Sequence, residues 1–323
     1  MKKQKSVVGS FLRKNVILLL LVAMIVIFSI AMRAFLSVTN LMNIYNQNAS
    51  LLLSSCGLAM IMISGGIDLS IGYIASLCGV VAAILMKNYG VNIYVAILAA
   101  LVIGAACGAL NGFLSNRLRI HTMIVTLATM TLFQGLSYII SGSKSYSSLP
   151  AAFKFLGQGY IGKVPVSIFL VALIIAAGSF FLNKTHFGRY MYAIGGNPDA
   201  AFLAGINVGS VRQRTFALNG AMVGMAAVLL ISRSGSASSS MGTSLQFDSI
   251  TACILGGVSF TGGAGKIGGV VLGVLCLGVL SNGMQLVGWG IYTQYVVKSI
   301  LLVAAIAFDL YTKSKELADR EGE

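Results

Sequence analysis

The sequence predicts an all-α, polytopic bundle of transmembrane helices. Apolar residues make up 57% of the 323 positions and charged residues only 9%, a composition that would leave a soluble domain with large exposed apolar surfaces. The chain also holds 38 glycines against 3 prolines, and small residues recur inside the apolar runs. This pattern favours closely packed helices over a β-barrel, whose strands alternate apolar and polar residues over about ten positions.

Apolar runs of roughly 17–25 residues mark the spans in chain order. We place ten of them, at residues 16–32, 45–64, 69–86, 93–115, 122–140, 164–182, 214–232, 246–258, 267–287 and 290–310. The eighth is too short to cross as a regular helix, and a broken or re-entrant shape survives only where protein or water shields its backbone. Ten spans put both termini on one side of the membrane.

The distribution of basic residues sets the orientation. If the amino terminus is cytoplasmic, fifteen of the 22 lysines and arginines fall on the cytoplasmic side. The opposite loops hold six, which are Arg33, Lys87, Lys144, Lys154, Lys163 and Arg233. The positive-inside rule therefore predicts that both termini are cytoplasmic. The net charge of +14 follows from this bias and from contact with anionic membrane lipids, so no nucleic-acid partner is expected.

Residues 1–323 are expected to form a single transmembrane domain. Its cytoplasmic parts are a basic segment at 1–14, a long loop at 184–213 and a tail at 312–323. Lys2 to Lys14 precede an apolar stretch, as in a secretory signal, but no small-x-small cleavage site precedes Arg33. We therefore expect this stretch to remain as the first span.

The loop at 184–213 contains the signature of one short helix. Asn197 can accept hydrogen bonds from the free amides of a first turn, Pro198 suits the first helical position, and Asp199 favours the positive end of the helix dipole. Gly205 can adopt the left-handed conformation that ends a helix. An exposed helix with small faces could sit in a groove of another protein, although an ordinary interfacial loop helix would look the same. The residues proposed for this contact are Asn197, Pro198, Asp199, Ala200, Ala201, Phe202 and Gly205.

A glycine pair interrupts the chain between the second and third spans, where residues 64–72 read SGGIDLSIG. Residues 255–261, LGGVSFT, repeat its pattern. Paired glycine breaks in two halves of a chain are how many transporters expose helix ends to their substrates. The alternative is a pair of tight cytoplasmic turns in which Asp68 or Ser70 caps the next helix.

Few polar side chains lie within the spans, and each is a candidate for the translocation pathway. A charge near mid-bilayer costs about 3 kcal/mol even on lenient scales, so Lys298 needs a partner such as Asp68 or Asp248, a water-lined path, or a route to the interface. Neutral amides suit hydroxylated solutes but can equally join helices. The candidate pathway residues are Ser64, Gly65, Gly66, Asp68, Ser70, Asn111, Asn282, Gln285 and Lys298.

Several patterns that resemble catalytic or cofactor sites fail on context. The sequence GAGKIG at 263–268 fits the dinucleotide fingerprint, but an apolar span follows it and no acid occurs before Asp309. The five cysteines all lie in apolar runs, which indicates packing residues. His121 and His186 are too far apart in sequence to suggest a shared metal. Because no catalytic cluster is present, we expect no cofactor, no metal and no enzymatic activity.

Glycines at four-residue spacing predict where spans pack closely. They are Gly104, Gly108 and Gly112, the pair Gly220 and Gly224, and the pair Gly269 and Gly273. Such stripes let two helix backbones approach each other.

Four stretches together resemble the permease subunits of bacterial ATP-binding-cassette (ABC) importers for simple sugars, of the ribose type. They are GGIDLSIG at 65–72, NGFLSNRLRIHTMIVTLAT at 111–129, FGRYMYAIGGNPDAAFLAGINV at 187–208 and LGGVSFTGGAGKIGGVVLG at 255–273. The resemblance implies a multi-pass protein of the bacterial cytoplasmic membrane. It also implies two cytosolic ATPase subunits, an extracytoplasmic sugar-binding protein, and a second permease subunit in a homodimer or a paired dimer.

In such permeases the loop after the sixth span carries a coupling helix with the pattern Glu-Ala-Ala, three residues, then Gly. Asp199, Ala200, Ala201 and Gly205 fit this pattern, except that aspartate replaces glutamate and the downstream Ile-x-Leu-Pro is missing. Closure of the ATPases would then pull on residues 197–205 and rock the spans around a central path.

Two other classes of protein remain as alternatives. A secondary carrier would need acidic groups in its spans to carry protons or sodium, and only Asp68 and Asp248 precede Asp309 there, both at predicted span edges. A membrane enzyme would need a catalytic cluster that the chain lacks. The substrate cannot be read from these residues, because a pentose, a hexose, a furanosyl signalling sugar and a nucleoside would all suit such a pathway.

Overall fold

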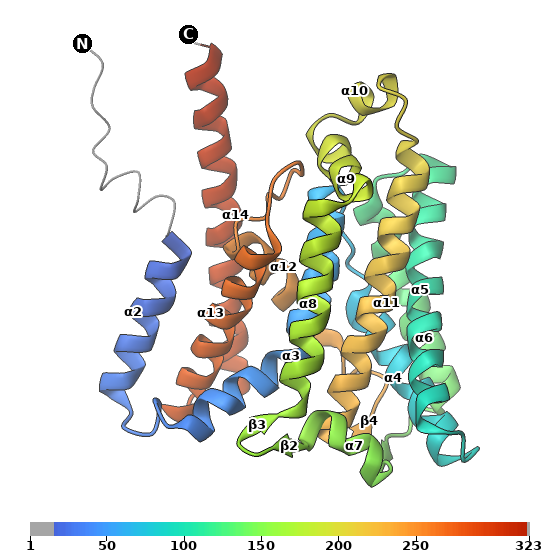
Figure 1. The fold of residues 1–323 in the computed structure, drawn as a ribbon, viewed down its shortest axis with the longest axis vertical. Helices are drawn as coiled ribbons and strands as arrows, with labels where there is room; N and C mark the ends of the chain where they lie inside the picture. Colours follow the sequence, from blue (N-terminus) through green and yellow to red (C-terminus); the bar gives the residue numbers. More distant parts are fainter. Residues whose placement is uncertain (1–15, 322–323) are drawn as a thin grey trace.

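The computed structural model describes residues 16–321 and shows a bundle of helices (Figure 1). The predicted basic segment 1–14 and residues 322–323 of the predicted tail lie outside the described residues. The helices are α2 Val16–Ala31, α3 Val38–Ile63, α4 Ile71–Lys87, α5 Ile93–Leu118, α6 Thr122–Ser141, α7 Ala151–Gln158, α8 Val166–Lys184, α9 His186–Gly196, α10 Pro198–Leu203, α11 Val208–Ser234, α12 Thr243–Leu255, α13 Ile267–Leu286 and α14 Ile291–Glu321.

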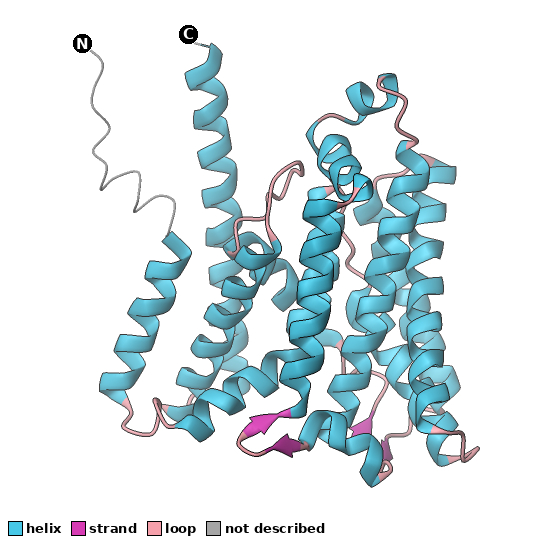
Figure 2. Cartoon of the chain, in the orientation of Figure 1, coloured by secondary structure: helices cyan, strands magenta, loops and turns pink. Residues whose placement is uncertain are grey.

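Strands are minor elements of this fold. The pairs are β1 (Tyr146–Ser147) with β4 (Ser236–Ala237), and β2 (Tyr160–Ile161) with β3 (Val164–Pro165), and both are antiparallel. Both pairs lie at one end of the bundle, beside α7 (Figure 2). They join loops rather than form a layer, so the architecture is all-α, as the sequence predicts.

Each predicted span falls on a helix. Six described helices are long and apolar enough to cross a membrane, namely α5, α6, α8, α11, α13 and the Ile291–Tyr311 part of α14. The helices α2 and α4 are apolar but shorter, and α3 and α12 belong to neither group. The chain is therefore a polytopic helical membrane protein.

The two ends of the bundle differ in what they carry (Figure 1). The first turn of α2, the helices α9 and α10, and the last turns of α14 lie at the upper end in that view. The helix α7 and both strand pairs lie at the lower end. The upper end is called the α10 end below.

Glycine stripes join the helices at the centre of the bundle, as predicted. A Cβ on Gly104 would overlap the carbonyl oxygen of Gly220, and one on Gly108 would overlap that of Phe216, so α5 and α11 pack with their backbones in contact. A Cβ on Gly273 would likewise overlap the carbonyl oxygen of Ala252, which joins α13 to α12. Only glycine allows this approach.

Two non-helical segments enter the bundle from opposite ends and meet inside it. Residues 64–70 run inward from the α10 end, and the segment after β4 runs inward from the other end. They meet where α4 and α12 begin, because a Cβ on Gly72 would lie 2.9 Å from the carbonyl oxygen of Gly242. The Gly242 amide donates to Ser76 Oγ at 3.0 Å. At about 1.5 Å per residue, the 13 residues of α12 are too short to cross a bilayer core, as predicted for the eighth span.

Burial is uneven across the bundle. Most of α4 and the second half of α3 are buried, and so is 72% of the most apolar 18-residue stretch of α11. By contrast, the most apolar stretch of α14, within Ile291–Tyr311, contains no buried residue. Within one chain, α14 therefore offers an apolar face to whatever surrounds it.

Candidate functional site

The short helix α10 forms as its sequence predicts. Asn197 Oδ1 accepts from the Ala200 amide at 2.9 Å, and Pro198 occupies the first turn. At the other end the Gly205 amide donates to the Phe202 carbonyl at 2.9 Å and the Ile206 amide to the Ala201 carbonyl at 3.1 Å. This pair of bonds is a Schellman termination, and Gly205 supplies the required positive φ of 83°.

The surface of α10 is suited to contact with another protein. Phe202 is 69% exposed and Leu203 is 84% exposed, whereas Ala201 is buried against the bundle. Large apolar side chains at a bundle end are rarely left this open unless something covers them. Phe202 and Leu203 therefore project from the bundle end.

The helix α9 connects α10 to the bundle. Asn197 is both the C-cap residue of α9 and the N-cap residue of α10, so no linker separates the two helices. Tyr192 on α9 donates to the Gly265 carbonyl at 2.7 Å. Burial raises the pKa of the Tyr192 hydroxyl, so the hydroxyl keeps the proton that it donates.

The two repeated glycine motifs are both helix terminations, and their match is shifted by one residue from the sequence alignment. Gly65 follows the end of α3 with φ 79°, and Gly257 follows the end of α12 with φ 76°. The structural equivalent of Gly65 is therefore Gly257 rather than Gly256. The two motifs also touch, since the Gly263 amide donates to the Ile63 carbonyl at 2.9 Å.

Just after the glycine pair Gly65 and Gly66, Asp68 lies at the centre of a buried polar cluster. Its side chain is 0% exposed. Its Oδ1 accepts from the Ser70 amide at 2.9 Å and from Ser70 Oγ at 2.6 Å, and its Oδ2 accepts from Asn219 Nδ2 at 3.0 Å. Asn111 Nδ2 donates to Ser70 Oγ at 2.8 Å. Hydrogen bonds rather than a counter-ion hold this carboxylate, since the one ion pair of the described chain lies elsewhere.

Threonines of α6 hold the backbone of the same segment. The Ile67 amide donates to Thr122 Oγ1 at 3.0 Å, and the Leu69 amide donates to Thr126 Oγ1 at 3.1 Å. Residues 66–70 are all buried, so the segment is no exposed turn. Instead, it links α4, α5, α6 and α11.

Sequence reasoning missed Asn219, which supplies one of the bonds to Asp68. The available signal was an Asn-Gly pair inside an otherwise apolar run. The Oδ1 atoms of Asn111 and Asn219 are buried and have no hydrogen-bond partner. Two acceptors beside a carboxylate leave the cluster with spare capacity for a donor.

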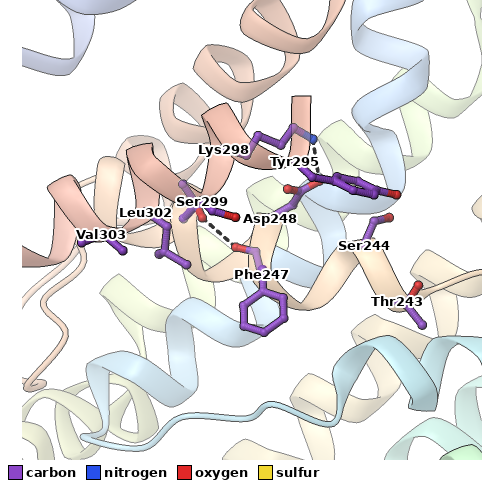
Figure 3. Close-up of a pocket in the computed structure, with 10 residues that line it drawn as sticks. Thr243, Ser244, Phe247, Asp248, Tyr295, Lys298, Ser299, Leu302 and Val303 are labelled. Atoms are coloured by element: carbon purple, nitrogen blue, oxygen red, sulfur yellow. Dashed lines mark hydrogen bonds and ion pairs between the residues drawn. The ribbon is translucent and has the colours of Figure 1, made fainter. Parts of the chain in front are cut away.

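Lys298 pairs with Asp248, one of its two predicted partners. Lys298 Nζ lies 2.9 Å from Asp248 Oδ2, and their side chains are only 18% and 19% exposed. Figure 3 shows the two residues reaching toward each other from α14 and α12. They line a cavity of about 410 Å³ between these helices. Its polar lining consists of Thr243, Ser244, Asp248, Thr251, Lys298 and Ser299.

Asn282 and Gln285 belong neither to the Asp68 cluster nor to the lining of the α12–α14 cavity. Asn282 exchanges two hydrogen bonds of 2.9 Å with Asn40, which joins α13 to the start of α3. Gln285 is exposed. Of the predicted pathway residues, Asp68, Ser70 and Asn111 thus belong to the buried cluster, Lys298 lines the α12–α14 cavity, Asn282 belongs to this amide pair, and Gln285 belongs to none of the three. Within residues 16–321, no group of three or more His, Cys, Asp or Glu side chains could hold a metal ion.

Comparison with known proteins identifies the class. The family described as the permease component of branched-chain amino acid transport systems matches residues 40–306. The chain is 34% identical to the ribose import permease of Escherichia coli K12, covering 90% of this chain and 92% of that protein. It is 37% identical to the ribose import permease of Bacillus subtilis 168, covering 88% and 89%. No solved structure matches.

The chain is therefore a membrane transport permease and not an enzyme. More particularly, it belongs to the family of permease components of branched-chain amino acid transport systems. The galactose/methyl galactoside import permease of E. coli K12 is also similar, at 34% identity over 93% of this chain and 95% of that protein. The apolar helices of the present chain make it a multi-pass membrane protein, and its membership of this permease family assigns it to the cytoplasmic membrane.

Proposed function

We propose that this chain is the membrane-spanning subunit of an ATP-driven importer for a monosaccharide, either ribose or a related sugar. The names of its relatives support this class of substrate, because they describe import or transport of ribose, galactose or xylose. The permease itself carries out no covalent chemistry. An extracytoplasmic sugar-binding protein delivers the substrate and supplies the affinity, so the path needs few polar groups.

The structural observation that carries the coupling role is α10. It is capped at both ends, projects from the bundle and exposes Phe202 and Leu203. A short, capped helix with two exposed apolar side chains suits a groove on a cytosolic ATPase. Residues 197–205 would move when the ATPases close, and the motion would change which side of the path is open.

The proposed topology has ten spans with both termini in the cytoplasm. Two features support it. The start of α2, the end of α14 and α10 lie at the same end of the bundle (Figure 1), and the loops rich in lysine and arginine fall at that end. The short helices α4 and α12 count as spans because each continues a non-helical segment that runs into the bundle.

The proposed translocation path includes the α12–α14 cavity, and a second copy of the chain covers it. An ion pair facing lipid would be expensive, yet Asp248 and Lys298 lie beside the unburied face of α14. A second permease subunit packed on this face would enclose the pair and the apolar surface together. The other predicted pathway residues, in segment 64–70 and at Asn111, Asn282 and Gln285, remain proposals for the same path.

Reconstitution tests the proposal. The purified chain is placed in proteoliposomes with its ATPase and binding protein, and uptake of radiolabelled ribose, galactose and xylose is measured with and without ATP. We expect ATP-dependent uptake of at least one sugar, and none when the ATPase is omitted. Uptake by the chain alone under a proton or sodium gradient would instead identify a secondary carrier.

A further inference from the structure

The loop at residues 256–266, called the junction loop below, contacts α9 without side chains between them. A Cβ on Gly195 would overlap the carbonyl oxygen of Ile63 and lie 2.5 Å from the Gly263 amide nitrogen. The Tyr192 hydroxyl bonds to Gly265 in the same loop. At Gly195 the two backbones touch with no side chain between them that could change its rotamer. A shift of α9 therefore displaces the loop directly.

The junction loop also touches the end of α3. A Cβ on Gly262 would lie 2.8 Å from Gly65 Cα, and the Gly263 amide donates to Ile63. Gly262 and Gly263 have φ angles of 94° and 76°, which L side chains rarely adopt. Gly65 and the glycine pairs at 195–196 and 262–263 therefore meet at one point at the α10 end.

The junction loop contacts both helices of the cavity. The loop continues directly from Leu255, the last residue of α12. Its Phe260 amide donates to Asp309 Oδ2 on α14 at 3.2 Å. Asp248 lies two turns before the end of α12, and Lys298 lies three turns before Asp309. The loop is thus bonded to both partners of the Asp248–Lys298 pair through the helices that carry them.

We propose that Gly195 and Tyr192 are positioning residues that carry the movement of α10 through the junction loop to the cavity between α12 and α14. This inference rests on the proposed function. Because α10 shares Asn197 with α9, displacement of α10 moves α9 as a unit. The glycine contact then moves the junction loop, and the loop shifts α12 relative to α14.

Neighbouring glycines of α9 provide a matched pair of variants. A Cβ at Gly195 meets backbone atoms, whereas a Cβ at Gly196 has nothing within 4 Å. Both residues lie in the same helical turn, where alanine is a better helix former than glycine. Gly195→Ala therefore pushes α9 away from the junction loop, while Gly196→Ala leaves the contact in place. Tyr192→Phe removes only the bond to Gly265 and adds no atoms.

The experiment measures sugar uptake per ATP hydrolysed, in proteoliposomes that hold the complete complex. Gly195→Ala should keep ATP hydrolysis but lower uptake per ATP by about tenfold, a typical size for a coupling free energy. Tyr192→Phe should lower it by about two- to fivefold. Gly196→Ala should match the unaltered protein.

A second readout follows the cavity itself. Ser299 lines the cavity and is exposed, whereas the five native cysteines are buried. Ser299→Cys is therefore introduced as a reporter, and its rate of maleimide labelling is compared with and without ATP. The rate should change with ATP in the otherwise unaltered complex and in Gly196→Ala, but not in Gly195→Ala. A purely structural defect would not remove this response while ATP hydrolysis continues.

The outcomes separate this inference from the proposed function. If the unaltered complex shows no ATP-dependent uptake, the proposed function fails and the inference fails with it. If the unaltered complex couples and Gly195→Ala couples equally well, only the inference fails. Equal damage from Gly195→Ala and Gly196→Ala would also overturn it. Should Gly195→Ala fail to fold, Tyr192→Phe decides, and normal uptake per ATP in that variant rejects the inference.

Discussion

At the scale of single residues, the interior of this permease is held by hydrogen bonds more than by charges. Asp68 is buried with three hydrogen-bond donors, and among residues 16–321 no cation lies in its ion-pair range. Each donor would be left without an acceptor if the carboxylate were removed. A buried donor without a partner costs about 1–3 kcal/mol, so this one side chain stabilises the contact of several helices.

Asp68→Ala should therefore lower the stability by at least about 2 kcal/mol, because several donors lose their acceptor at once. Asp68→Asn should be milder, because the new amide keeps one oxygen for Ser70. Its NH₂ group can bond to the free Oδ1 of Asn219 if that amide turns over. Thermal unfolding of the purified variants in detergent measures both.

The control for this pair is Thr131→Ala, which removes an exposed hydroxyl bonded only to its own helix. It should change the stability by less than about 0.5 kcal/mol. Equal losses for Asp68→Ala and Asp68→Asn would mean that charge, rather than hydrogen bonding, holds the cluster.

The pair of Lys298 and Asp248 allows stability and transport to be separated. Lys298→Met leaves Asp248 unpaired at 19% exposure, and we expect a loss of about 1–3 kcal/mol. Adding Asp248→Leu should restore most of it, because an apolar pair is tolerated where a lone charge is not. Thermal unfolding of the unaltered protein, both single variants and the double variant measures the interaction free energy of the pair. If the cavity lies on the path, the restored double variant should still transport poorly.

At the scale of elements, α10 is the best example of what local chemistry alone determines. Its cap, its proline and its terminal glycine act within a few residues, so the sequence predicts both of its ends. The positions of the spans follow equally well from the apolar runs. The start of α3 was not predictable in this way, because residues 38–44 include Thr39, Asn40 and Asn43, and the predicted span begins only at residue 45.

Asn40 and Asn46 are tolerated in α3 because distant residues satisfy them. Asn40 pairs with Asn282, and Asn46 accepts from Ser167 Oγ. The same reason explains why the Asp68 cluster could not be predicted, since Asn219 lies 151 residues further along the chain. Sequence spacing indicates which side chains need partners but does not identify partners that tertiary packing supplies.

The end of α10 gives a prediction at this scale. Gly205→Ala places a side chain at φ 83°, which strains the Schellman turn by about 1 kcal/mol with open space around it. The bundle should stay folded, while ATP hydrolysis and sugar uptake become uncoupled, more so when Asp199→Ala is added. Asn197→Ala should act in the same direction by loss of the cap. Normal sugar-stimulated transport in the Asp199→Ala and Gly205→Ala double variant would contradict the coupling role of α10.

At the scale of the whole molecule, the two ends of the bundle must face opposite sides of the membrane. Leu203 on α10 and Ile161 on β2 are 84% and 60% exposed and lie at opposite ends (Figure 1). The native cysteines are buried, so a cysteine introduced at either position reports its own surroundings. Leu203→Cys should react with an impermeant maleimide only in inside-out vesicles, and Ile161→Cys only in right-side-out vesicles.

This labelling is a test of the molecule rather than of one helix, because α10 and β2 are joined through α8, α9 and the loops at their ends. Gly142, at the end of α6, has open space around it but a left-handed φ of 59°, so Gly142→Cys strains this turn by about 1 kcal/mol and should label from the same side as Ile161→Cys. Reaction of Leu203→Cys from the outside would place α10 away from any cytosolic ATPase. Every step from ATP hydrolysis to the α12–α14 cavity depends on α10 facing the cytosol, so that single result would remove the basis for coupling through α9 and the junction loop.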